Sequence, residues 1–413
     1  MQKKLIALAI AGISGAAFAQ SNVTVYGAAD ASYDFINVSG GMPGADTPNY
    51  GRVSSNGSHI GFKGMESLGN GMVAVFQYET AVNLDAGAGN SLLGSSRDSY
   101  IGLAGGFGTV ILGSASGPTR ALGQAMDVNS NKDGIASNKA ILGKMSGLLA
   151  GLNVTNLGGA NLAVTGSNPF AGQARSSNGA SIFDQYLPNV IAYVTPNFNG
   201  FQGTIGYVAD ENKSDVAATK VRTSALDLGV TYSNGPIWAG LTHGDIQVRN
   251  QDVPAGGAGT LASGLTFLMG DNVRTKETRL GGKYDFGNAT VRLMWSRNKV
   301  EAGSNASALG VDWKQTTWGI GGTYNVTANG KLTAQYYKAK DVTGNVGVSD
   351  TGAKFYTLGY EHSLSKRTML VANYAYLKND QNAIGYDFGN NSTGLAGADV
   401  KLSALTFGMR HSF

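Results

Sequence analysis

The last nine residues of the chain constrain its fold more than any other stretch. Apolar side chains stand at the odd positions Leu405, Phe407, Met409 and Phe413. Polar or small residues stand at the even positions between them, and His411 is the one polar residue at an odd position. Successive side chains of a β-strand point to opposite faces, so this strand has one apolar and one polar face. A chain that stops on such a strand is expected to close into a barrel, because an open edge leaves backbone groups unpaired.

The first 19 residues have the pattern of an export signal. Two lysines precede an apolar run at 5–13, and small residues then lead to Ala17-Phe18-Ala19. A charged start, an apolar centre and an A-x-A site are typical of a cleaved signal peptide. A run of about nine apolar residues is too short to cross a bilayer as a helix. We therefore expect residues 1–19 to be removed and the mature chain to begin at Gln20.

The composition favours a membrane barrel over an ordinary soluble protein. The chain has 61 Gly, 18 Tyr and 15 Phe, and it has no Cys, so no disulfide stabilises it. Only 14% of its residues are charged, yet its mean hydropathy is −0.09. Strands that alternate between lipid and lumen have this property, because the two faces cancel in any hydropathy window. Without the leader, Lys and Arg exceed Asp and Glu by only about two, which argues against nucleic-acid binding.

Short turn signals recur through the mature chain, each between two strand-like segments. They are rich in Gly, Asn, Ser and Pro and lie at 66–71, 104–108, 196–200, 233–236, 285–288, 326–330 and 363–366. Seven such turns join fourteen strands. The first and last strands raise the expected number to about sixteen, an even number as in bacterial outer-membrane barrels.

Longer polar segments separate these hairpins, at 38–57, 210–222, 249–275 and 379–399. Short periplasmic turns and long extracellular loops are typical of outer-membrane barrels. No linker marks a second domain, so residues 20–413 are expected to form a single unit. The sequence predicts an all-β fold, a 16-stranded antiparallel transmembrane β-barrel. A soluble β-sandwich is the alternative, but such sandwiches rarely reach this length as one unit.

Alternation within the strands assigns side chains to the two faces. Phe76 and Tyr78 are expected to face lipid, whereas Gln77 and Glu79 face the lumen. Aromatic residues also gather beside the short turns, where a barrel places its interfacial girdle.

One connection, from about 114 to 187, is far longer than the others. It contains charged residues, among them Arg120 and Asp127, and an apolar stretch near 141–152. A loop of this length in a compact fold is usually functional. It either folds into the lumen and narrows it, or it forms an extracellular flap.

The sequence gives little support to metal or catalytic chemistry. The segment 127–134 begins like a calcium-binding loop, but Lys132 and Asn138 stand where such a loop needs Gly and Glu. The four histidines, His59, His243, His362 and His411, lack the spacing of a metal motif. His243 and Asp245 share a strand face, which is more often a wall pair than a catalytic dyad. We expect no cofactor, no metal and no enzyme activity.

Several segments of the chain resemble the general diffusion porins of Gram-negative outer membranes, specifically the betaproteobacterial type. They are 23–27 (VTVYG), 61–71 (GFKGMESLGNG), 100–110 (YIGLAGGFGTV), 195–201 (TPNFNGF), 364–368 (LSKRT) and the final strand. The resemblance implies an outer-membrane homotrimer surrounded by lipid, with the third loop folded into the pore as a constriction. It also implies that Phe413 is the assembly signal for the barrel-insertion machinery. The implied function is passive diffusion of small hydrophilic solutes and ions through a water-filled lumen.

The chain departs from such porins at the wall arginines that usually face the infolded loop. His59, Ser114 and Ala192 stand where the resemblance implies arginine, and Arg97 remains. An unperturbed histidine has a pKa of about 6.5, so His59 would gain charge as the pH falls. The resemblance therefore implies weak selectivity near neutral pH, shifting toward anions on acidification.

The residues expected to set selectivity are Arg97, His59, Glu79, Arg120 and Asp127. Their role follows from pore physics, because the charges at the narrowest point decide which ion passes. The competing hypothesis is an adhesive or structural outer-membrane barrel that acts through its extracellular loops. A stable open channel in a planar bilayer would distinguish the two.

Overall fold

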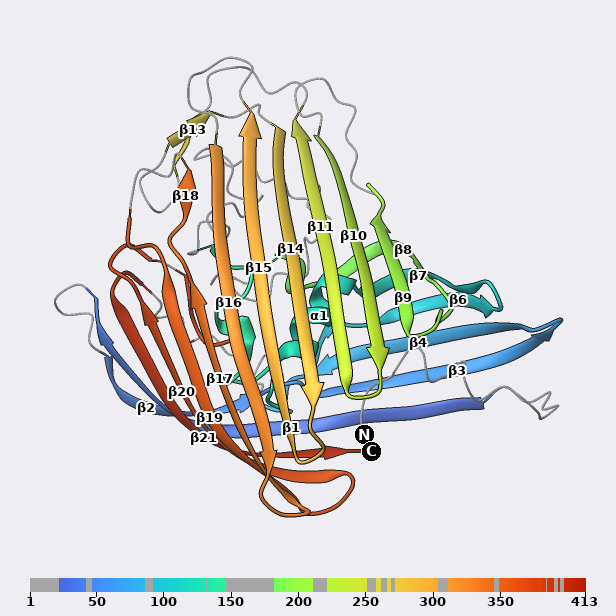
Figure 1. Ribbon diagram of the computed structural model, residues 1–413, viewed down its shortest axis with the longest axis horizontal. Helices are drawn as coiled ribbons and strands as arrows, with labels where there is room; N and C mark the ends of the chain where they lie inside the picture. The colour runs from blue at the N-terminus through green and yellow to red at the C-terminus, as the bar shows by residue number, and fades with distance from the viewer. Residues whose placement is uncertain are drawn as a thin grey trace.

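The computed structural model describes residues 22–41, 47–85, 92–130, 133–145, 182–210, 221–250, 258–260, 266–268, 272–303, 311–344, 349–383, 385–389, 393 and 397–413. Antiparallel strands build the wall of a barrel, and most of them pair with strands adjacent in the chain (Figure 1). The wall strands are β1 (Asn22–Gly40), β2 (Thr47–Ser55), β3 (His59–Gly69), β4 (Met72–Val82), β5 (Leu93–Ser96), β6 (Ser99–Gly105), β7 (Gly108–Ser116), β8 (Tyr186–Val194), β9 (Phe201–Val208), β10 (Val221–Asn234), β11 (Ile237–Asn250), β14 (Asn272–Asp285), β15 (Ala289–Gly303), β16 (Val311–Asn325), β17 (Gly330–Ala339), β18 (Thr343–Gly344), β19 (Ala353–Ser363), β20 (Thr368–Asn379) and β21 (Val400–Ser412).

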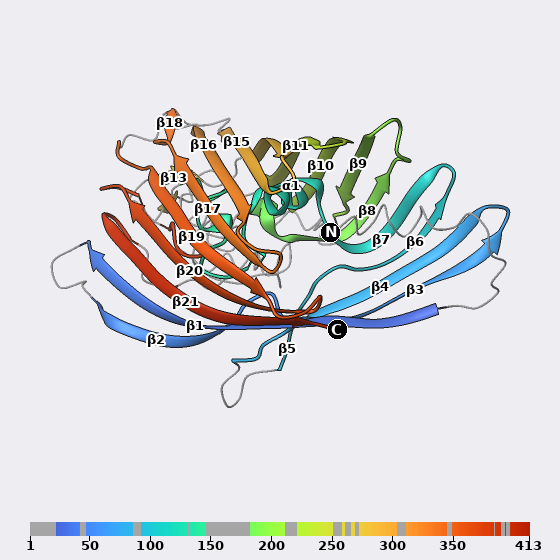
Figure 2. The same ribbon diagram turned by 60° about the horizontal axis from the view of Figure 1, so that its bottom comes forward.

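The barrel closes between its first and last strands, which lie side by side (Figure 2). Their register runs from Ala28 opposite Ser412 to Gly40 opposite Val400, and Phe413 exchanges two 3.1 Å backbone hydrogen bonds with Gly27. Three positions of the wall are interrupted strands, namely β2 with β3, β5 with β6 and β17 with β18, each pair lying against one neighbour. The wall is therefore the predicted closed 16-stranded antiparallel barrel.

The alternation expected from the sequence governs the faces of the wall. In β19 every second residue is exposed, with Leu358 59% exposed and Phe355 fully buried. In the last strand Phe407 and Met409 are exposed and Thr406 is buried. Tyr78 is exposed and Glu79 is buried, as predicted for the lipid and lumen faces.

All seven predicted short turns are found at one end of the barrel, joining β3 to β4, β6 to β7, β8 to β9, β10 to β11, β14 to β15, β16 to β17 and β19 to β20. At the other end, the loop predicted at 379–399 lies between β20 and β21 as expected, whereas the one predicted at 38–57 is shorter. Much of 38–57 is strand, because β1 continues to Gly40 and β2 covers Thr47–Ser55. The polar residues that suggested a loop are instead strand residues, some of which face the lumen. Within 249–275 the short strands β12 (Ala258–Thr260) and β13 (Thr266–Leu268) pair with each other. Most of 210–222 lies outside the described residues, as does the predicted leader.

The connection from β7 to β8 enters the barrel. It contains the helix α1 (Pro118–Met126) and the short helices η1 (Asn138–Ala140) and η3 (Ile182–Asp184). Strands enclose α1 in both views (Figures 1 and 2). We call residues 117–130 and 133–145 the infolded segment. Its infolding excludes the extracellular flap for these residues, and 146–181 lie outside the described part of the chain. Among the described residues, no helix is long and apolar enough to cross a membrane.

An apolar cluster fills one side of the barrel interior. Its wall part consists of inward-facing residues opposite one another on adjacent strands, and two loops pack against it: Val38, Tyr337, Phe355, Leu377 and Leu402 from the wall, Ile135, Ile141 and Leu142 from the infolded segment, and Ala383, Tyr386 and Phe388 from the last loop. We call this cluster the apolar filling. It shows that the last loop also bends inward.

Candidate functional site: the infolded segment and the lumen charges

Small inward-facing residues let α1 lie directly against the wall. Gly229, Gly240 and Gly281 belong to the neighbouring strands β10, β11 and β14. A Cβ atom at Gly240 would lie 2.9 Å from Leu122, and one at Gly281 would lie 2.9 Å from Met126. Glycine in a strand often marks such a close approach. The three glycines therefore fix where the helix crosses the inner surface.

The N-terminal end of α1 is anchored by a wall carboxylate. Asp227 of β10 accepts a 3.2 Å hydrogen bond from the backbone N–H of Thr119 and a 2.5 Å hydrogen bond from its hydroxyl. A negative side chain at a helix N-terminus is favourable, because free N–H groups and the helix dipole both attract it. Gly117 at the N-cap offers no side-chain cap, so Asp227 supplies the cap from outside the segment.

A buried arginine holds both ends of the β7–β8 connection. Arg279 of β14 binds the Asp184 carboxylate through two hydrogen bonds of 2.8 and 2.7 Å, and it donates to the Thr119 carbonyl at 3.1 Å. Its Nε donates to Glu277 at 2.6 Å. Two carboxylates thus satisfy a side chain with no solvent exposure. A buried pair of this kind is costly to break, because the remaining partner stays charged and unpaired.

Beyond α1 the infolded segment crosses the interior toward β17 and β19. Gln335 of β17 donates to the Ala136 carbonyl at 2.7 Å. Glu361 of β19 accepts two hydrogen bonds from Ser130, of 2.7 and 2.6 Å, and pairs with Lys331 at 2.6 Å. Wall groups on strands from β10 to β19 thus hold the segment along its length.

Three predicted site residues meet in one charged cluster on the wall. Arg97 is hydrogen-bonded to the Glu79 carboxylate, which also accepts a 2.9 Å hydrogen bond from the Tyr26 hydroxyl. The Nε2 atom of His59 lies 3.9 Å from Glu79. Its Nδ1 lies 2.7 Å from the carbonyl of Gly57, which can only accept, so Nδ1 carries a proton. Nε2 is then the atom that gains a proton on acidification.

Tyr186 connects this wall cluster to the infolded segment. Its ring centre lies 5.4 Å from the Arg97 guanidinium and 4.1 Å from that of Arg120. Two cations therefore lie against one ring, an arrangement that cation–π attraction favours. Arg120 also donates to the backbone carbonyl of Asp184. The predicted residues Arg97 and Arg120 thus lie on either side of the boundary between wall and segment.

Asp127, the fifth predicted residue, takes part in the folding of the segment itself. It is buried, and its carboxylate accepts 3.0 Å hydrogen bonds from the backbone N–H groups of Asn129 and Asn138. Arg292 binds its backbone carbonyl. The structure therefore places Asp127 away from the cluster of the other four, and its role in selectivity stays a prediction.

Another acidic residue of the segment is close to that cluster. Asp133 forms an ion pair with Lys139 and packs near Gly57. Burial by itself raises the pKa of Asp133, but the attraction of Lys139, and then of Arg120 and Arg97, outweighs it and holds the pKa far below its usual range. Asp133 therefore stays ionised at all ordinary pH values.

Sequence reasoning missed several inward-facing charged residues. Asp30 pairs with Arg410 at 2.9 Å, and Asp34 lies 3.4 Å from Arg52. Asp30 and Asp34 lie at even positions of the first strand and Arg410 at an even position of the last, which is the lumen-facing set. Strand alternation could therefore have identified these three residues. Arg279 had no such signal, because its importance comes from Asp184, which is distant in sequence.

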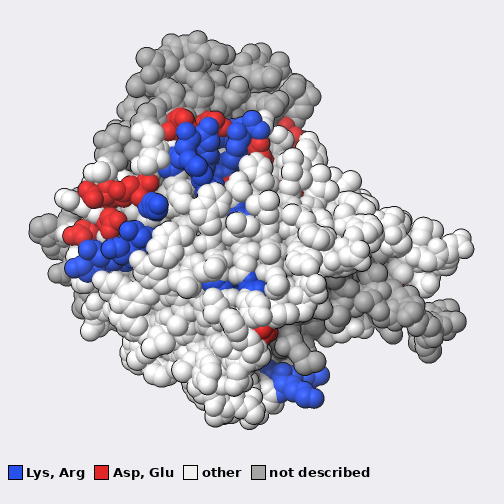
Figure 3. Space-filling view, viewed as in Figure 1, with Lys and Arg blue, Asp and Glu red and all other residues white. Residues whose placement is uncertain are grey.

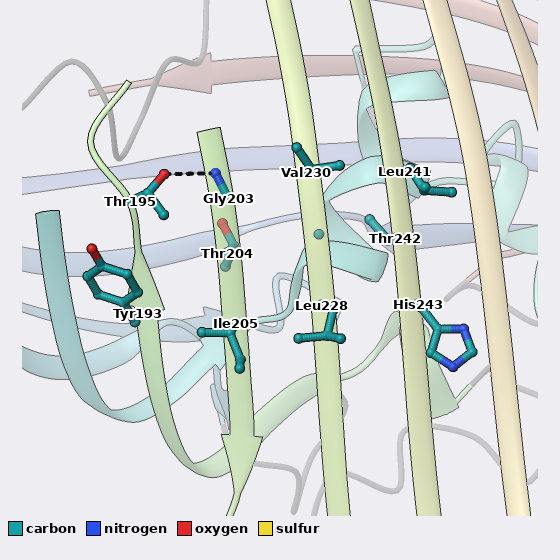
Figure 4. Close-up of a pocket in the computed structure, with 11 residues that line it drawn as sticks. Tyr193, Thr195, Gly203, Thr204, Ile205, Leu228, Val230, Leu241, Thr242 and His243 are labelled. Atoms are coloured by element: carbon teal, nitrogen blue, oxygen red, sulfur yellow. Dashed lines mark hydrogen bonds between the residues drawn. The ribbon is translucent and has the colours of Figure 1, made fainter. Parts of the chain in front are cut away.

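An apolar hollow of about 380 Å³ lies across β8 to β11 (Figure 4). Its side chains include the exposed residues Ile205, Leu228 and Leu241. These belong to the outer face of the wall, so the hollow is not part of the passage through the barrel.

Comparisons with known proteins agree with this architecture. The chain matches the Gram-negative porin family over residues 5–382. It is 30% identical to outer membrane porin protein 32 of Delftia acidovorans over 420 aligned residues, which cover all of both chains. It is 26% identical to an outer membrane porin protein of Bordetella pertussis, again with complete coverage of both.

Solved structures show the same fold. An anion-selective porin from Comamonas acidovorans superposes with a TM-score of 0.69 at 25% identity, covering 95% of this chain and all of that chain. OmpT of Vibrio cholerae superposes with a TM-score of 0.62 at 14% identity, covering 95% and 98%. At the latter identity the likeness concerns the fold alone.

Proposed function

The chain belongs to the Gram-negative porin family, and we propose that its lumen charges make it a weakly selective channel. As an outer-membrane porin it forms a passive-diffusion channel in the bacterial outer membrane. Family and relatives point to a channel rather than an enzyme. Small hydrophilic solutes and ions are the expected cargo, since passage needs only a water-filled lumen.

The pairing of many lumen cations with carboxylates is the observation that carries this proposal, whereas Arg120 and Arg292 bind backbone carbonyls. The paired cations each have a carboxylate within 4.0 Å, in the pairs Arg52–Asp34, Arg97–Glu79, Lys139–Asp133, Arg279–Asp184, Lys331–Glu361 and Arg410–Asp30. Selectivity depends on the net field at the narrow point, and a neutral pair contributes little to that field. The Comamonas relative is described as anion-selective. We expect weaker selectivity here, with His59, Ser114 and Ala192 at positions where such porins often carry arginine.

A reversal-potential measurement across a salt gradient tests the proposal. We expect a value near zero at pH 8 for the wild type. Glu79→Gln leaves Arg97 without its counter-charge, so its reversal potential should shift toward anions. Glu66, exposed near the turn end of β3 and changed to Gln, is the matched control. Strong anion selectivity of the wild type would refute the proposal.

The remaining expectations concern export and assembly. We propose that residues 1–19 are cleaved and that the mature chains form a homotrimer. An N-terminal mass measurement and native electrophoresis test these two points.

We also propose that Phe413 is the signal read by the barrel-insertion machinery. Its backbone pairing with Gly27 at the closing seam supports this role. Deleting Phe413 should reduce surface-exposed protein and leave periplasmic aggregate. Normal yield from the truncated chain would contradict the proposal.

A further inference from the structure

Four lysines stand directly opposite one another on the outer face of the barrel. The register pairs Lys338 with Lys354, Lys354 with Lys378, and Lys378 with Lys401, across β17, β19, β20 and β21. Each is next in sequence to a buried inward-facing residue of the apolar filling, so each points outward. We call these four residues the lysine ladder. It lies at the strand ends opposite the short turns, which is the extracellular end of the barrel.

No ion pair in the described part of the chain neutralises the lysine ladder, although the carboxylates of Asp341 and Asp380 lie one step farther out, beside Gly352. None of its four side chains forms an ion pair within 4.0 Å or a hydrogen bond with another described residue. Directly opposite residues of an antiparallel pair have Cβ atoms about 5 Å apart, and like charges at that distance are destabilising. The arrangement therefore calls for an anion from outside the chain.

A second lysine row on the same face shows how the chain neutralises such charges elsewhere. Lys276, Lys299 and Lys314 stand opposite one another on β14, β15 and β16. Glu301 pairs with Lys276 at 2.8 Å and also with Lys299, and Asp312 pairs with Lys314 at 3.1 Å. Figure 3 shows blue and red groups together near the upper strand ends, above a mostly white wall. No lysine of the ladder forms such an ion pair with a described residue.

The position of the lysine ladder along the barrel axis indicates which layer of the membrane surrounds it. Tyr336, Tyr356 and Tyr376 stand opposite one another on the same face. Each lies two positions along its strand from a ladder lysine, toward the middle of the wall. The rings of Tyr356 and Tyr376 stack with centres 5.0 Å apart. Aromatic rows of this kind mark the boundary between the apolar band and the headgroups. The ladder lies roughly 7 Å farther out, since each residue of a strand rises about 3.4 Å.

We propose that the lysine ladder binds the phosphorylated headgroup of an outer-leaflet lipid. Phosphate oxygens accept hydrogen bonds from ammonium groups and supply the missing negative charge. The tyrosine row and exposed residues such as Leu358 contact the acyl chains below. Near a membrane surface, each basic residue strengthens binding to anionic lipid about fivefold. Loss of all four lysines is then expected to weaken binding more than about a hundredfold.

The test measures lipid binding to the full mature protein in detergent by native mass spectrometry. The probes are bisphosphorylated lipid A, the same lipid after removal of its phosphates, and inorganic phosphate as competitor. The variants are a fourfold Lys→Gln change of the ladder, the charge-preserving Lys354→Arg, and Lys366→Gln with Arg367→Gln at the exposed periplasmic turn. Unchanged single-channel conductance verifies that each variant is folded.

We expect the wild type, Lys354→Arg and the turn variant to retain the phosphorylated lipid, and the fourfold variant to lose it. The dephosphorylated lipid should bind all four proteins equally weakly. Equal retention of phosphorylated lipid by the fourfold variant would overturn the proposal. Displacement by inorganic phosphate at equal concentration would also overturn it, in favour of a soluble-anion site. If the fourfold variant lost its association with other subunits but still bound the lipid, the proposal would be wrong and the ladder would be a protein contact instead.

Discussion

The two sides of the barrel interior hold the infolded segment by different forces. Near β4 and β8 the contacts involve charged groups, since Arg97 binds Glu79 and the ring of Tyr186 lies against both Arg97 and Arg120. Near β17 to β21 Gln335 and Glu361 still form hydrogen bonds with the segment, but most of the support is apolar, with side chains such as Phe388 fully buried. Ion pairs and hydrogen bonds are directional and tolerate adjacent water, whereas apolar contacts exclude it. The charged side therefore suits a solute path, and the apolar side suits a fixed support.

Removal of Arg279 should have the largest effect on this arrangement. Arg279→Met leaves Asp184 and Glu277 buried without their counter-charge, which costs about 3–5 kcal/mol. The ends of the β7–β8 connection should then leave the wall, and single-channel recordings should show higher conductance and greater current noise. Arg297→Met, on the exposed outer face of β15, is the matched control. Equal recordings from both variants would show that Arg279 does not hold the segment.

A change on the apolar side should loosen the support without altering selectivity. Phe388→Ala removes a fully buried ring from the apolar filling and should destabilise its packing by about 3–5 kcal/mol. We expect a lower melting temperature and more current noise, with an unchanged reversal potential. Phe286→Ala, at a turn where the ring is 63% exposed, is the control. A shifted reversal potential in Phe388→Ala would mean that the two sides are not separate in function.

The charged side should respond to acid through His59. A proton added at Nε2 puts a positive charge beside Glu79, which Arg97 already neutralises. Reversal potentials should shift toward anions as the pH falls below about 6.5, the ordinary pKa of histidine. We expect roughly a twofold change in permeability ratio from one added charge. His59→Ala should flatten the response and His411→Ala, on the exposed terminal strand, should not.

This comparison also explains what the sequence could and could not predict. Period-two alternation and turn residues act locally, so they predicted the barrel, its seven turns and the lumen position of Glu79. The supports of the infolded segment are not local, because Arg279 and Asp184 are 95 residues apart. The loop 379–399 was predicted as a polar extracellular segment. Its Tyr386 and Phe388 are instead buried inside, since the wall offers them an apolar surface formed by other strands.

The smallest predicted effect tests the border between the two sides, at Lys144. This residue of the infolded segment is buried and donates to the backbone carbonyl of Asp387 at 2.8 Å. Burial lowers the pKa of Lys144 to about 8, against the weaker attraction of Asp387 and Asp184. A lysine in water has a pKa of about 10.4, so the docked segment releases its proton at lower pH than the undocked segment.

The sign of the pH effect follows from this order. Below about pH 8 the lysine is charged in both states, and docking bears the full cost of burying the charge, roughly 3 kcal/mol. Between about pH 8 and 10 the docked lysine becomes neutral, so docking strengthens and current noise should fall. Lys144→Met should show low current noise at both about pH 8 and about pH 10. Lys366→Met, in the exposed turn, should keep the pH response of the wild type. An unchanged pH dependence in Lys144→Met would show that this side chain does not limit docking.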